Sequence, residues 1–252
     1  MTDSLVLDQW ITLASKMRQG GIELVQRAGA TISNADLDDP RVVALQLVAR
    51  TLGHLKSVVL LANAGMLTEA LTLARSCYEN SFRIARLNKD GDSFVSEMKA
   101  EEVANVRARG QRLLEGRTEI EPEQKDDIRQ VLRMIKQHHQ GVSTLAPKQV
   151  VDETEISEAY IAYMILSRDS HPTLSSLGRH LEFDGAEDGS PIFVVEPVPT
   201  SEQLTEVLIF ACTATLTACT SVVQIVGLLH PPASLAEASQ TFERLIRGPL
   251  PK

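Results

Sequence analysis

Apolar residues recur every three to four positions along most of the chain, the spacing of one face of an α-helix. The pattern predicts helices over about 4–32, 41–62, 68–87, 92–114, 122–139, 157–170, 174–181, 201–229 and 234–246. We expect Gly20 and Gly21 to interrupt the first helix, because glycine is a poor helix former. Around Pro147 the pattern weakens, which indicates a connector over 143–151.

One segment is typical of β-structure. Glu182-Phe183 precedes the turn residues Asp188-Gly189-Ser190, and the apolar run from Ile192 to Val195 follows them. We predict a small hairpin near 182–195. Since no strands alternate with the helices, the predicted fold class is all-α, a multi-helix bundle of eight or nine helices.

A long apolar stretch is a candidate membrane span. No residue between Val207 and Leu229 is charged, although several are Thr or Ser. Neither flank carries the Lys or Arg that normally sets the orientation of a span. We therefore interpret about 201–229 as a long apolar helix packed on the rest of a single domain over 1–252, and we expect no membrane partner.

Composition narrows the classes of function. The 252 residues have a net charge of −8, which argues against broad binding to nucleic acid. The cysteines Cys77, Cys212 and Cys219 are sparse and odd in number, as expected for reduced thiols in a cytoplasmic protein. The N-terminus also lacks the basic start and apolar run of a secretory signal.

The helix predicted over 68–87 carries a stripe of polar and aromatic side chains. Its members are Arg75, Tyr78, Glu79, Phe82 and Arg86, and small or aliphatic residues occupy the opposite side. In one interpretation Arg75 and Glu79 form an ion pair on a half-buried helix, which stabilises by only ~0.3–0.5 kcal/mol. In the other, the stripe is the wall of a ligand site.

The end of the helix predicted over 157–170 is the second candidate. Its polar face consists of Tyr160, Tyr163, Ser167 and Arg168, and His171 continues that face. The following proline ends the helix there, and the helix dipole favours a protonated imidazole at its C-terminus. Such a cluster can bind an anion, perform acid–base catalysis, or form a hydrogen-bond network that fixes the bend.

Together the two segments resemble a family of uncharacterised bacterial helical proteins, known as a domain of unknown function. The resemblance covers about 45–182 and is carried by Ala70-x-x-Leu73-x-Arg75-x-x-x-Glu79 and Tyr160-x-x-Tyr163-x-x-Leu166-Ser167-x-x-x-His171. It implies an α-helical domain in which one pocket brings together Arg75, Glu79, Tyr163, Ser167 and His171.

A more distant similarity is to the HEPN superfamily, whose active members are metal-independent ribonucleases of toxin and phage-defence systems. Their signature is an Arg followed at an interval by a His, and here Arg168 and His171 take those places with a shorter interval. The resemblance implies that Arg168 holds the scissile phosphate and that His171 acts as acid or base.

No cofactor and no metal are expected. The chain has neither the Gly-x-Gly-x-x-Gly turn nor the Gly-x-x-x-x-Gly-Lys loop that cradles phosphates. His54, Glu79 and His171 could be neighbours in a bundle, but no pair shows the Glu-x-x-His or His-x-x-x-His spacing of helical metal sites.

Three classes of function follow. The first is a binding or regulatory module, in which Arg75, Tyr78, Glu79, Tyr163 and Ser167 hold a small anionic or nucleotide-like ligand. The second is a ribonuclease that acts through Arg168 and His171, with RNA as its partner. The third is a structural or interaction protein that forms a homodimer.

Overall fold

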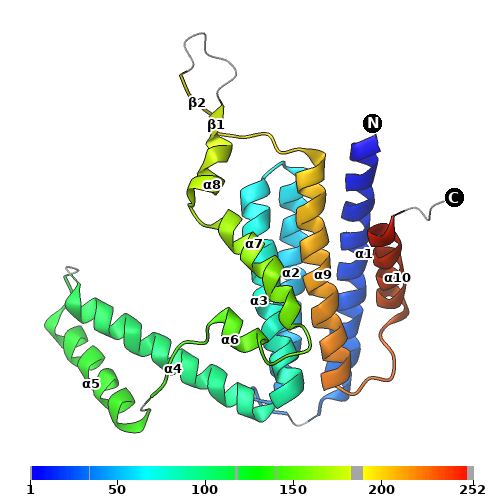
Figure 1. The fold of residues 1–252 in the computed structure, drawn as a ribbon. Coiled ribbons are helices and arrows are strands. Elements are labelled where there is room, and N and C mark those ends of the chain that lie inside the picture. The colour runs from blue at the N-terminus through cyan, green and yellow to red at the C-terminus, as the bar shows by residue number, and fades with distance from the viewer. Residues whose placement is uncertain (1, 34, 117–118, 140, 183–189, 249–252) are drawn as a thin grey trace.

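The computed structural model describes residues 2–33, 35–116, 119–139, 141–182 and 190–248, which are almost entirely helical (Figure 1). The helices are α1 (Thr2–Thr31), α2 (Pro40–Asn63), α3 (Leu67–Asp90), α4 (Asp92–Glu115), α5 (Pro122–His138), α6 (Pro147–Val151), α7 (Tyr160–Ser170), α8 (Leu174–Leu177), α9 (Ser201–Ile225) and α10 (Ala233–Arg247). Two 3-10 turns, η1 (Ser157–Ala159) and η2 (Gly178–His180), precede α7 and follow α8. The all-α prediction is confirmed.

A two-stranded antiparallel sheet pairs β1 (Leu181–Glu182) with β2 (Ile192–Phe193). Leu181 lies opposite Phe193, and Glu182 lies opposite Ile192. This confirms the small hairpin, while Phe183 and the Asp188-Gly189 part of its predicted turn lie outside the described residues.

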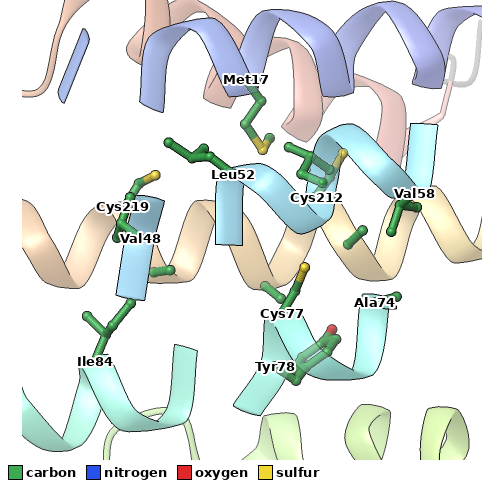
Figure 2. Close-up of a cluster of buried hydrophobic side chains, with 14 of the residues drawn as sticks. Met17, Val48, Leu52, Val58, Ala74, Cys77, Tyr78, Ile84, Cys212 and Cys219 are labelled. Atoms are coloured by element: carbon green, nitrogen blue, oxygen red, sulfur yellow. The ribbon is translucent and has the colours of Figure 1, made fainter. Parts of the chain in front are cut away.

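The core is the space between α1, α2, α3 and α9. Helix α3 packs on α2 and α9, and helix α1 packs on α2, α9 and α10. Figure 2 shows that Met17, Leu52, Cys77 and Cys212 bring side chains from these four helices together. Removal of this apolar surface from water is the main force that holds the bundle together.

All three cysteines are free and buried in this core (Figure 2). Burial raises the pKa of Cys77 and of Cys219 to about 12, and it raises the pKa of Cys212 as well. The thiols therefore stay protonated and unreactive at neutral pH, as structural cysteines do.

The predicted interruption of the first helix is wrong, because α1 continues through Gly20 and Gly21. A Cβ atom at Gly20 would lie 2.6 Å from the backbone nitrogen of Leu235, and one at Gly21 would lie 2.5 Å from Cδ2 of Leu52. Gly20 is thus needed for the close approach of α10 to α1, whereas at Gly21 the nearest atom is the end of the Leu52 side chain. Neither glycine marks a turn.

The connector predicted over 143–151 also needs correction, because it contains α6. Pro147 is the first residue of this short helix, where its missing N–H costs nothing. Val150 and Val151 are buried, and α6 packs on α3. Pro147 therefore begins a short helix, and two buried valines anchor that helix on α3.

The long apolar helix is α9, and it packs on α1, α2 and α3. Half of its most apolar window of 18 residues is buried, against 39% of the corresponding window in α2. By length and composition alone, both helices would be long and apolar enough to cross a membrane. The contacts of α9 are those of the core helix that we expected.

Helix α7 lies across α3 and positions the candidate site (Figure 1). It ends at Ser170, and His171 has the extended backbone angles φ −94° and ψ 155°. Proline disfavours the helical conformation in the residue before it, so Pro172 accounts for this bend. The bend leaves the imidazole of His171 beside α3.

Candidate functional site

Arg75 and Glu79 lie one turn apart on α3. The distance between Nη2 of Arg75 and Oε1 of Glu79 is 3.2 Å, and the two side chains are 22% and 33% exposed. An i,i+4 ion pair on a helix stabilises by ~0.3–0.5 kcal/mol. Both groups stay within reach of solvent, so the pair is neither sealed in the core nor a strong contribution to stability.

Tyr163 of α7 contacts both of these groups. Its hydroxyl donates to Oε1 of Glu79 at 3.2 Å, and its ring centroid lies 5.8 Å from the guanidinium carbon of Arg75. Burial, and after it the negative charge of Glu79, raises the pKa of Tyr163. The phenol therefore keeps its proton as a donor to Glu79. Ser167 is half-buried and lies one turn after Tyr163 on α7.

His171 completes the cluster from the end of α7. Nη1 of Arg75 lies 3.0 Å from Nε2 of His171. In this contact the guanidinium group can only donate, so Nε2 is the acceptor.

The bend holds His171 in place. Its backbone N–H donates to the carbonyl of Ser167 at 3.2 Å, and its carbonyl accepts from Oγ of Ser176 at 2.5 Å. The side chain itself is exposed. The imidazole is thus fixed by its backbone and by Arg75 while one edge of the ring is open to solvent.

The structure does not bring Tyr78 into this cluster. Tyr78 is 3% exposed, and its ring lies 6.5 Å from that of Phe210 on α9. Burial raises its pKa. The polar stripe of the sequence is therefore divided, with Tyr78 towards α9 and Glu79 towards α7.

Arg168 also lies apart from the contacts of Arg75. Its Nε donates to Oδ1 of Asp169 at 3.0 Å, and its side chain is 59% exposed. Asp169 is almost buried, and its second oxygen pairs with Arg179 at 3.4 Å. Arg168 and Arg179 thus share the carboxylate of Asp169, which was not among the predicted site residues.

A continuous row of aromatic rings links the cluster to the core. The rings are, in order, Phe210, Tyr78, Phe82, Tyr163 and Tyr160, and neighbouring centroids are between 5.5 and 6.5 Å apart. The last two rings are stacked, with an angle of 24° between their planes. Because Tyr160 is only partly buried, the row ends in an aromatic surface beside Tyr163.

A second arginine–histidine pair lies on α2 and was missed as such. Nε of Arg50 donates to Nε2 of His54 at 3.3 Å. Burial lowers the pKa of His54, the cation of Arg50 lowers it further, and the carboxylate of Glu79 partly opposes them. His54 is therefore close enough to Glu79 for the carboxylate to affect its pKa. The i,i+4 spacing of Arg50 and His54 is the sequence signal that could have found this pair.

Glu79 also borders a pocket of about 220 Å³. Its other lining residues are Phe82, Arg83, Leu145, Pro147 and Val150, from α3, α6 and the segment before α6. The carboxylate of Glu79 accepts from Tyr163 and pairs with Arg75, and it also faces this pocket. A carboxylate held in this way can orient a hydrogen-bonding ligand. Within the described ranges, no group of three or more His, Cys, Asp or Glu side chains could hold a metal ion.

These contacts define an all-helical protein with a half-exposed cluster of one carboxylate, one phenol, one imidazole and one guanidinium at the junction of α3 and α7. The chain belongs to a family of unknown function, DUF5677, which matches residues 41–190. The matched range includes both segments of the cluster. No curated protein and no solved structure matches the chain. The similarity to HEPN proteins stays a prediction.

Proposed function

We propose that the junction of α3 and α7 binds a small anionic or nucleotide-like ligand, and that the chain is a binding or regulatory module. The observation that carries this proposal is the contact of Arg75 with His171 across 96 positions of sequence. The guanidinium group and the exposed imidazole next to it give an anion two groups to bind.

Two further features support a ligand in preference to a purely structural network. The ion pair of Arg75 and Glu79 is half-buried and lies one turn apart on α3, and such an i,i+4 pair stabilises by only ~0.3–0.5 kcal/mol. Tyr160, which is stacked on the buried ring of Tyr163, is a partly exposed aromatic ring next to the polar groups. A nucleotide has the matching combination of an aromatic base and an anionic phosphate.

Binding can be tested with inorganic phosphate and the common ribonucleoside 5′-monophosphates as probes in a thermal-shift assay. We expect at least one probe to raise the melting temperature, because a ligand at about 100 times its Kd stabilises by roughly 2.7 kcal/mol. Arg75→Gln should lower the affinity for that probe at least about tenfold, since it removes the cation that pairs with the anion.

Arg129→Gln is the matched control, because Arg129 lies on α5 and pairs only with Asp126 among the described residues. It should leave the shift unchanged. Absence of a shift with every probe at millimolar concentration, or an equal shift in the Arg75→Gln chain, would be the contradictory result.

The ribonuclease interpretation has weaker support in the geometry. It needs Arg168 to hold a phosphate beside His171, but the guanidinium of Arg168 is paired with Asp169, and His171 is paired with Arg75. Cleavage of RNA by the purified chain in the presence of a chelator, lost in His171→Ala, would favour it over the binding module.

A further inference from the structure

Helices α4 and α5 form a hairpin that projects from the bundle like an arm (Figure 1). Along these two helices only Phe94, Val95, Ala104 and Ile135 are buried. The helices come together at Gly110, where a Cβ atom would lie 3.2 Å from Cδ2 of Leu132. The arm therefore has little core of its own, and most of its surface is accessible.

A groove of about 810 Å³ runs between the two helices of the arm. The charged side chains that line it are all basic, namely Arg107, Arg133 and Lys136, and His139 lies beside them. The whole chain has a net charge of −8, so this surface has the opposite sign from the protein as a whole. Clefts lined by one sign of charge concentrate ions of the other sign.

These cations are not compensated within the arm. Among the described residues, neither Arg133 nor Lys136 has a carboxylate within ion-pair distance, whereas Arg129 on the same helix pairs with Asp126 at 2.8 Å. Arg107 uses one donor, Nη2, on the carbonyl of Val142 at 2.8 Å, which fixes its side chain against the wall of the groove. Its other guanidinium donors are left for a ligand.

The helix dipole does not account for this arrangement. Basic residues in the last turn of α5 are favoured by the dipole, which explains Lys136 and the histidines after it. Arg107 belongs to the other helix, and Arg133 precedes the last turn. Their position on the same groove needs a different reason, and an anion between the helices supplies one.

We propose that the groove of the α4–α5 arm binds adjacent phosphate groups, as found in an oligophosphate or in the backbone of a nucleic-acid strand. Arginine binds phosphate oxygens through two parallel N–H donors, and lysine adds a point charge. Arg107 approaches from one helix while Arg133 and Lys136 approach from the other, so the phosphates lie between them. This site is separate from the junction of α3 and α7 and does not depend on a ligand there.

The test measures binding of inorganic tripolyphosphate by calorimetry, and of a fluorescent single-stranded RNA oligonucleotide by anisotropy, to the full chain. The double variant Arg133→Ala, Lys136→Ala should lower the affinity for the probe that binds by roughly tenfold or more, because it removes two of the three cations. For the oligonucleotide, three phosphate contacts predict a slope of about −2 in a plot of log K against log salt.

Arg109→Ala with Arg112→Ala is the matched control, because it removes the same charge from the same arm at residues outside the groove. Binding of both probes would support the site, binding of tripolyphosphate alone would identify a small oligophosphate, and binding of RNA alone would identify a strand. The proposal is overturned if neither probe binds, or if the two double variants weaken binding equally while circular dichroism shows both folded.

Discussion

Replacing Phe82 with alanine should lower the free energy of unfolding by about 3–5 kcal/mol, the usual cost of emptying a large buried aromatic site. Phe82 is fully buried, and its ring lies 6.0 Å from that of Tyr78 and 5.8 Å from that of Tyr163. In a protein of this size about 1 kcal/mol corresponds to roughly 2–4 °C, so the melting temperature should fall by on the order of 10 °C.

The control is Phe193→Ala in strand β2, where the same substitution removes a side chain that is 78% exposed. Its effect should stay within about 0.5 kcal/mol. Similar losses of stability in the two variants, measured by differential scanning calorimetry, would mean that Phe82 is not enclosed between the core and the candidate site.

Gly20→Ala should also destabilise the protein, by about 1–3 kcal/mol, although alanine is the better helix former. The new Cβ would lie 2.6 Å from the backbone nitrogen of Leu235, and a backbone atom cannot move aside as a side chain can. Helix α10 would have to separate from α1. Limited proteolysis should therefore detect faster cleavage in the segment between α9 and α10.

Gly29→Ala in the same helix is the matched comparison, because no atom of a packed helix or a neighbouring side chain lies within 4 Å of a Cβ placed there. This variant should be neutral or more stable by up to about 1 kcal/mol through helix propensity alone. An equal gain of stability from both glycine substitutions would contradict the close packing of α10 on α1.

Local sequence signals were sufficient for most helix boundaries. Pro40 and Pro122 begin α2 and α5, and Gly91 separates α3 from α4 with a positive φ of 49°. The errors arose where tertiary contacts decide the role of a residue. Gly20 permits a close approach of another helix, and Pro147 begins a helix because buried valines follow it.

The candidate site could be predicted only in part. Helical spacing put Arg75 and Glu79 on one face and placed His171 at a bend, and the structure joins them. Spacing alone could not show that Tyr78 turns towards α9 or that Arg168 pairs with its neighbour Asp169, because both depend on which helices pack together. The homo-oligomer and the cytoplasmic location stay predictions, which light scattering and cell fractionation can test.

The most direct test of the cluster is a double-mutant cycle with Arg75→Ala, His171→Ala and the double variant, using free energies of unfolding from urea titrations. If the guanidinium group donates to the imidazole across the α3–α7 junction, the coupling energy should be about 1 kcal/mol, typical of a half-exposed hydrogen bond to a charged group. Effects that add to within about 0.3 kcal/mol would show that the two side chains do not interact, and would contradict the joined site.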